Sequence, residues 1–436
     1  MVRPVFATQF LVNEALSLKS RLQTIRPFAL NSPMVAAACI SDPALKGITD
    51  LMIRNNNELR SRIDAFIQLL KGDAGRNIST EEAQGRFSIL KLRFNAMLDQ
   101  LDIFANVVTQ RSEHETGVWM AGLDVLATDV LNLKPKMYDA PEVVCFVTRG
   151  HGAAIRRART RLPGGDENPV AVIQVPRERL ISSGIASSLV HEVGHQGAAL
   201  LDLVVTLRDD IRKKQAAGRN KMAWGLYYDW ISEIISDFWA MAHLGIGATL
   251  GLISVVSLPR YFMFRVRPGD PHPFPWIRVK LSLSFGKALY PHAQWERFEK
   301  LWERMYPLHK LDAQSRQVIA DLNAAMPEFT QLLINHRSQK LNGKRLSEIF
   351  PAQFRQPAHL QFLFNTWKFA PQKMNNAPPS LVFAVIGQAH ADMNISAATE
   401  GAVLSKWLRQ WALLRSESRT SRESKNVLNQ LNKFIN

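Results

Sequence analysis

The sequence predicts a mainly helical α+β fold, in which a small β-sheet and two site-bearing helices are flanked by helical regions. Apolar residues recur at intervals of three and four before residue 137 and after residue 277. Two short runs rich in β-branched residues, Glu142–Thr148 and Val170–Val175, lie between these stretches. Hydrophobic residues make up 46% of the 436 residues and charged residues 21%, so the chain can bury a sizeable core.

These patterns divide the chain into three parts. Residues 1–137 form an N-terminal helical region, residues 138–310 hold the strands and the candidate site, and residues 311–436 form a C-terminal helical region. The last part includes a basic, serine-rich tail, RSESRTSRESK (415–425), which we expect to be exposed.

The middle part predicts two strands followed by two helices. A Gly-, Pro- and Arg-rich connection (150–169) between the strands indicates a loop or hairpin excursion. The first helix is expected to start near Ser182–Ser183, where hydroxyls can cap free N–H groups, and to end near Leu207. A polar link (208–220) leads to a second helix over Tyr228–His243.

The stretch SSLVHEVGHQGAALLDLVV, from Ser187, holds two histidines inside an apolar run. On a helix, His191 and His195 sit about 40° apart around the axis and one turn along it, so they can share one metal ion. Glu192 projects to the side where a metal-bound water would lie, and its carboxylate can pass a proton from that water to a leaving amine. Chance supplies this motif in roughly one such chain in a hundred. It therefore favours a catalytic zinc helix over two histidines buried in a core.

Two acidic residues supply the rest of the predicted site. In DWISEIISDFWA, from Asp229, Glu233 and Asp237 lie four apart and share one face of an otherwise apolar helix. Carboxylates in such surroundings need partners, because unpaired buried charges are costly. We predict that Glu233 is the third zinc ligand. Asp237 is expected to accept the second N–H of a ligand histidine, which fixes its tautomer and raises its basicity.

A third element is the proline-rich stretch DPHPFPWIRV, from Asp270. His272 and Arg278 on this stretch can each reach the oxyanion of a tetrahedral intermediate, so both are catalytic candidates. The alternative is a turn with an incidental histidine and a structural arginine.

Together the three elements resemble the gluzincin metallopeptidases. HEVGH matches the HExxH signature, Glu233 and Asp237 match the ExxxD helix, and HPFPWIRV (272–279) matches the HPxxxxR element of the HtpX-type peptidases, often called minigluzincins. The match covers roughly residues 142–279. Ser232 departs from it, because thermolysin-like enzymes carry Asn before the ligand Glu.

The resemblance implies a zincin-like catalytic domain at residues 138–310 with one zinc ion per chain. His191, His195 and Glu233 would bind the metal and Glu192 would be the base. Asp237 would support a ligand histidine, with His272 or Arg278 near the cleft. In gluzincins the strand before the metal helix forms the edge of the cleft and pairs with an extended substrate. The run at 170–175 is the strand directly before the predicted metal helix, so the expected substrate is a peptide or protein.

The expected function is therefore a zinc-dependent endopeptidase. Two alternatives stay open. One is a non-catalytic or structural zinc-binding interaction protein, a pseudopeptidase. A structural zinc site would have no need of Glu192 as a base, which counts against this alternative. The other is a membrane-associated HtpX-like protease. Phe238–Leu258 carries no formal charge and is long enough to span a bilayer, but it continues the Glu233 helix, so we favour a buried helix pair turning near Gly245–Gly247.

The net charge and the cysteine content limit which partners and which cellular location we expect. The formal net charge of +16 can attract an acidic partner surface. No zinc-finger or RNA-binding signature accompanies it, so we expect no nucleic-acid partner. The two cysteines are too few for a disulfide framework. We read no signal peptide and expect a cytoplasmic location, with membrane association or signal-less export as alternatives.

Overall fold

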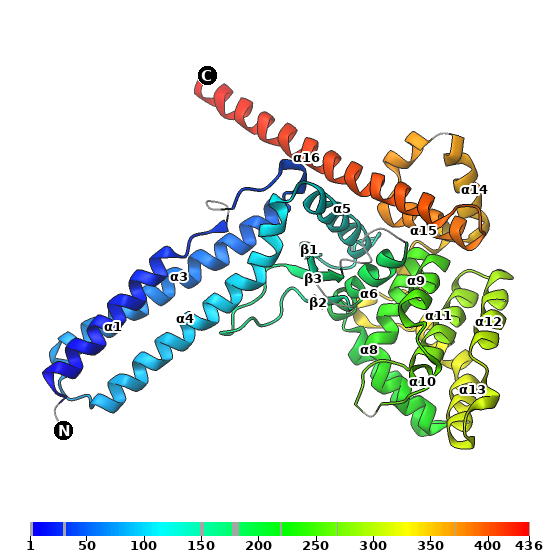
Figure 1. Cartoon of the computed structure of the whole chain (residues 1–436), viewed down its shortest axis with the longest axis horizontal. Coiled ribbons are helices and arrows are strands. Elements are labelled where there is room, and N and C mark those ends of the chain that lie inside the picture. Colours follow the sequence, from blue (N-terminus) through cyan, green and yellow to red (C-terminus); the bar gives the residue numbers. More distant parts are fainter. Residues whose placement is uncertain are drawn as a thin grey trace.

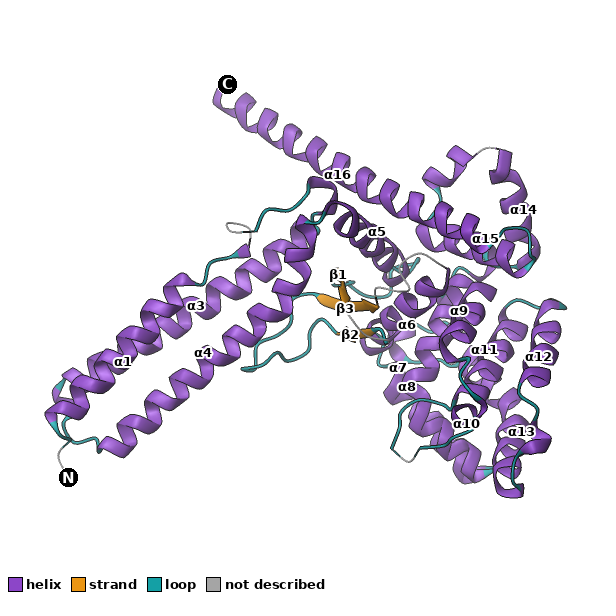
Figure 2. Cartoon of the chain, in the orientation of Figure 1, coloured by secondary structure: helices purple, strands orange, loops and turns teal. Residues whose placement is uncertain are grey.

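The computed structural model describes residues 3–28, 32–148, 152–176, 183–218, 220–267, 269–369 and 371–435. Over these residues the chain is mainly helical and holds one three-stranded sheet, which confirms the predicted mainly helical α+β class. Figure 2 shows the strands as a small group between a long helical arm and a larger helical body.

The arm is built from three long helices and extends to one side of the molecule (Figure 1). These are α1 (Val5–Thr24), α3 (Asp42–Lys71) and α4 (Thr80–Thr109). The hydroxyls of Ser41 and Ser79 accept backbone N–H groups in the first turns of α3 and α4, which is why those helices begin there. The apolar faces of the three helices enclose a core of their own.

The sheet confirms both predicted strands to within one residue and the hairpin excursion between them. Its strands are β1 (Val143–Thr148), β2 (Ala154–Arg156) and β3 (Ala171–Pro176). The order is β1-β3-β2, with β1 parallel and β2 antiparallel to β3. The prediction that the run at 170–175 forms the edge of the cleft is therefore wrong. β3 is paired on both sides, so β1 and β2 are the two edge strands, and β2 is the one whose residues line the site cavity.

The sheet joins the arm to the body through its two faces. Side chains alternate along a strand, so Val144 and Val172 pack into a cluster with the base of the arm. Cys145 and Ile173 point the other way, into the large core of the body. That core also contains side chains of the C-terminal helices, up to Trp411.

Two helices of the body carry the predicted site residues, α6 (Ser183–Leu200) and α8 (Lys221–Leu244). The expected extension of the first helix to Leu207 is wrong. The chain turns at Asp202, whose φ is 53°, and enters α7 (Leu203–Ala217). The expected polar link at 208–220 is thus mostly helix, and α8 starts seven residues earlier than predicted.

The uncharged stretch after Asp237 is a buried helix pair, as favoured from the sequence. α8 ends at Leu244, Gly245 turns the chain with φ 57°, and α9 (Ile246–Val256) follows. Among the described residues no helix combines the length and apolarity needed to cross a membrane.

Further helices complete the body and cover the site helices. The α-helices are α5 (His114–Leu131), α10 (Arg260–Met263), α11 (Pro275–Leu289), α12 (Gln294–Met305), α13 (Ala313–Asn335), α14 (Pro357–Phe369), α15 (Pro379–Ala391) and α16 (Ala397–Ile435). Short 3-10 turns are η1 (Ala36–Ala38), η2 (Asp73–Gly75), η3 (Gln110–Ser112), η5 (Leu308–Lys310), η6 (Gln339–Leu341), η7 (Leu346–Ile349), η8 (Ala352–Phe354) and η9 (Pro371–Asn376).

The basic tail is part of α16, which runs from the body past the base of the arm (Figure 1). Arg415 donates to the Cys39 carbonyl at 2.6 Å, and Arg419 pairs with Asp42 at 2.9 Å. The expectation that the whole tail is exposed is therefore wrong at its start, because these two arginines hold it against the N-terminal segment.

Candidate metal centre

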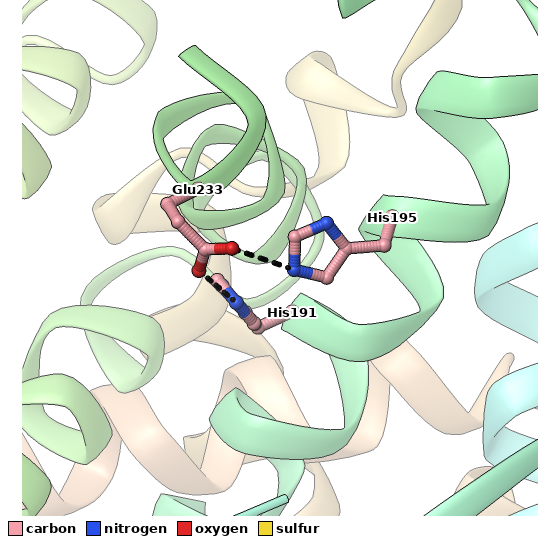
Figure 3. Close-up of side chains that lie close together, drawn as sticks. All are labelled: His191, His195 and Glu233. Atoms are coloured by element: carbon pink, nitrogen blue, oxygen red, sulfur yellow. Dashed lines mark ion pairs between the residues drawn. The ribbon is translucent and has the colours of Figure 1, made fainter. Parts of the chain in front are cut away.

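The structure brings the two predicted histidines and the predicted glutamate together (Figure 3). His191 and His195 lie one turn apart on α6, and Glu233 faces them from α8. His191 Nε2 is 3.2 Å from Glu233 Oε2, and His195 Nε2 is 3.3 Å from Glu233 Oε1. One atom from each residue lies within 4.8 Å of the other two, so these three residues could hold a metal ion.

Close packing of α6 against α8 sets this distance. Val190 and Val193 are buried on α6, as are Ile234 and Ile235 on α8. Gly194, inside the HEVGH motif, lies directly against α8. A Cβ atom there would come within 2.9 Å of the Cα of Ser236, which real side chains essentially never do. The glycine therefore permits the approach that brings Glu233 opposite the histidines.

Asp237 lies one turn beyond Glu233 and holds His191 from the other side. His191 Nδ1 donates to Asp237 Oδ1 at 2.7 Å. This contact leaves His191 Nε2 facing Glu233, as the predicted supporting role of Asp237 requires. Arg278 donates to both oxygens of the same carboxylate, at 2.6 and 2.9 Å. Burial raises the pKa of Asp237, but Arg278 and His191 outweigh it, so its pKa lies well below the usual range.

The three candidate ligands differ in their protonation. Burial disfavours the charged form of His191, but the Asp237 carboxylate overcomes this effect and raises the pKa of His191 to about 9. Burial and the charge on His191 lower the pKa of His195 to about 4. Burial also acts against the Glu233 carboxylate, yet the hydrogen bond and charge of His191 lower its pKa to about 2. At neutral pH the site thus holds one imidazolium, one neutral imidazole and one carboxylate.

Glu192 lies in the same cavity as these ligands and is largely buried. Burial raises the pKa of its carboxyl group, although the charge of His191 acts in the opposite direction. A carboxyl group with a raised pKa is better placed to accept a proton and then release it.

The two candidates from the proline-rich stretch take different positions. His272 is half-exposed, and its Nε2 lies 3.3 Å from Glu233 Oε2, while its Nδ1 is 2.8 Å from Asp270 Oδ1. Arg278 is mostly buried, and its contacts with Asp237 occupy Nε and Nη2. His272 therefore borders the open part of the site, whereas Arg278 lies behind it.

A cavity of about 510 Å³ gives access to all of these groups. One wall is the edge strand β2 with its flanks, where Ala154, Ile155 and Arg157 line the cavity. Leu252 and Val255 of α9 also line it. Sequence reasoning assigned no role to any of these residues. A period-two pattern was the only available signal for β2, and it is too short over three residues to be recognised.

No protein-family model, curated protein or solved structure matches the chain. The resemblance to gluzincins that the sequence predicts therefore rests on the three sequence motifs alone.

Proposed function

We propose that the chain is a zinc-dependent endopeptidase with a zincin-like catalytic domain of the gluzincin type. The observation that carries this proposal is the convergence of His191, His195 and Glu233 beside Glu192 in one cavity. A structural zinc site needs ligands but no base, whereas a zinc hydrolase needs both.

The donor set fits zinc. Two imidazole nitrogens and one carboxylate oxygen are a ligand set used by catalytic zinc, which keeps a further position for water. The contact between His191 Nδ1 and Asp237 leaves Nε2 of the same ring free to bind a zinc ion. We expect one zinc ion per chain, held by these two histidines and Glu233.

Each polar side chain of the site then has a distinct task. Bound zinc would supply Lewis acidity, which polarises the scissile carbonyl and lowers the pKa of a water at the open position. Glu192 takes a proton from the attacking water and transfers it to the leaving nitrogen. His272, on the open side of the cavity, donates a ring N–H to the oxyanion. Arg278 positions Asp237, which in turn orients His191.

The position of β2 supports a peptide as the substrate. In the described part of the chain this strand pairs only with β3, and residues of β2 line the cavity. An extended peptide can add to such an edge through backbone hydrogen bonds, which do not depend on its sequence. We expect a peptide bound in this way to enter the cavity that Glu192 lines.

Metal analysis combined with proteolysis tests the proposal. The purified parent should contain one zinc per chain and cleave casein or a peptide library, and a chelator should abolish the cleavage. Glu233→Ala should lose most of the zinc, whereas Glu296→Gln, at an exposed position on α12, should behave like the parent. Zinc binding by Glu233→Ala at the parent level would refute the ligand assignment. Stoichiometric zinc without any cleavage would instead favour the pseudopeptidase.

A further inference from the structure

A second cavity, of about 800 Å³, is lined by none of the metal-site residues. The ends of α5, α8 and α11, the turns η7 and η8, and the start of α15 contribute its lining. Most of these side chains are apolar, including Leu289, Ile349 and Leu381. Its size is typical of small-molecule sites, which combine apolar walls with a few polar groups.

Arg355 is the buried cation of this cavity, with 3% of its surface exposed. Its Nε donates to the His243 carbonyl at the end of α8 at 2.6 Å, and its Nη2 donates to Ser380 Oγ at 3.0 Å. Arg111 and Arg278, which are also well buried, each pair with a carboxylate. For Arg355, no carboxylate of the described residues lies within ion-pair distance.

The acidic side chains that line the cavity are engaged elsewhere. Asp129 accepts the backbone N–H of Ser380 at 2.9 Å, and Glu348 pairs with Arg345 at 2.8 Å. Neither carboxylate contacts the guanidinium of Arg355. Burial lowers the pKa of Arg355, and the charge of Asp129 acts against this effect from a greater distance. A guanidinium has five N–H donors in a planar fork that matches a carboxylate. Nη1 also donates to the Phe354 carbonyl at 3.5 Å, so one N–H on Nη1 and one on Nη2 are left for a further acceptor.

His243 is a second buried polar group in the lining, with 4% of its surface exposed. Neither ring nitrogen has a hydrogen-bond partner among the described residues. Burial, together with the charge of Arg355, lowers the pKa of His243 to about 3, so the ring is neutral and carries one N–H donor. A buried donor without an acceptor is costly, and most native structures satisfy such groups.

We propose that this cavity binds a small amphipathic carboxylate, with the carboxylate on the Arg355 guanidinium beside His243 and the apolar body against the aliphatic walls. A fatty acid of medium chain length has this chemistry. The ligand supplies the direct carboxylate contact that the buried guanidinium lacks, while its hydrocarbon chain fills space that is lined mainly by carbon. The site is separate from the metal centre and needs neither zinc nor peptidase activity.

Calorimetric titration with octanoate and with 1-octanol tests the proposal on the full chain. Octanoate should bind at a 1:1 ratio, and octanol at least about ten-fold more weakly, because it has no charge to place on Arg355. Histidine ring signals in a ¹⁵N NMR spectrum should show His243 shifting on titration with octanoate. Absence of octanoate binding, or equal binding of the alcohol, would overturn the proposal.

Variants at two positions separate binding from folding. Arg355→Gln should weaken octanoate binding at least about ten-fold, because the charge-assisted contact is lost. Ala288→Phe fills the same cavity without changing the charge and should also weaken binding. Arg304→Gln, on the exposed side of α12, is the matched control and should bind normally. If Arg355→Gln does not fold, octanoate binding by Ala288→Phe is the test of the site. Undiminished octanoate binding by a folded variant at either position would refute the site.

Discussion

Asp237→Asn is expected to weaken zinc binding about 10- to 100-fold without unfolding the protein. The carboxylate receives three short contacts, one from His191 Nδ1 at 2.7 Å and two from Arg278 at 2.6 and 2.9 Å. An asparagine has a single acceptor oxygen, and its NH₂ group would face a donor. At least one of these mostly buried N–H groups then loses its acceptor, at a cost of about 1–3 kcal/mol. A loss of 10- to 100-fold in affinity corresponds to about 1.4–2.7 kcal/mol, in the same range.

Competition with a chromogenic zinc chelator measures this affinity directly. Asp229→Asn is the matched control, because Asp229 lies on the same helix, α8, but is exposed. It should bind zinc like the parent, and circular dichroism should show both variants folded. If folded Asp237→Asn binds zinc as tightly as the parent, the role assigned to Asp237 is wrong.

Three further outcomes follow from the same structure. Zinc and a proton compete for His191, whose pKa is about 9, so zinc affinity should fall about ten-fold per unit as the pH drops from 8 to 6 in chelator competition. Gly194→Ala should lower the free energy of unfolding by about 1–3 kcal/mol in urea titrations, because its methyl group would overlap α8. Asp124→Asn should lower the free energy of unfolding by about 3–5 kcal/mol and lower the Tm, because it breaks a fully buried ion pair with Arg111.

Each of these outcomes has a result that contradicts it. A zinc affinity that does not change between pH 6 and 8 would mean that His191 carries no proton to displace. Gly85→Ala is the control for the glycine, since a Cβ atom there meets nothing within 4 Å, and it should stabilise α4 by about 0.5–1 kcal/mol. If Gly194→Ala has the same effect as Gly85→Ala, close helix packing does not set the site. An unchanged Tm for Asp124→Asn would refute the importance of the buried pair.

The local part of the site could be predicted from the sequence because helical spacing determines it. His191 and His195 share a face at any four-residue spacing on a helix, and so do Glu233 and Asp237. The need of buried carboxylates for partners correctly indicated that the two pairs would meet. The strands at 143–148 and 171–176 were also predictable, since β-branched runs of this length have few alternatives.

Features set by contacts between distant residues could not be predicted in this way. The edge of the sheet depends on which strand pairs with β3, and the three residues of β2 carry no hydrophobic period that reveals the pairing. The turn at Asp202 contains neither glycine nor proline, so nothing in the sequence separates α6 from α7. Arg415 reads as part of an exposed basic tail, yet its acceptor is the carbonyl of Cys39, far away in the chain.

The measurement that tests the peptidase proposal most directly compares Glu192→Gln with the parent for both zinc content and peptide cleavage. The variant keeps all three ligands, so it should bind zinc at the parent level. It lacks the carboxylate that moves the proton, so kcat should fall about 10²- to 10⁴-fold. Cleavage by zinc-loaded Glu192→Gln at the parent rate would contradict the proposed mechanism.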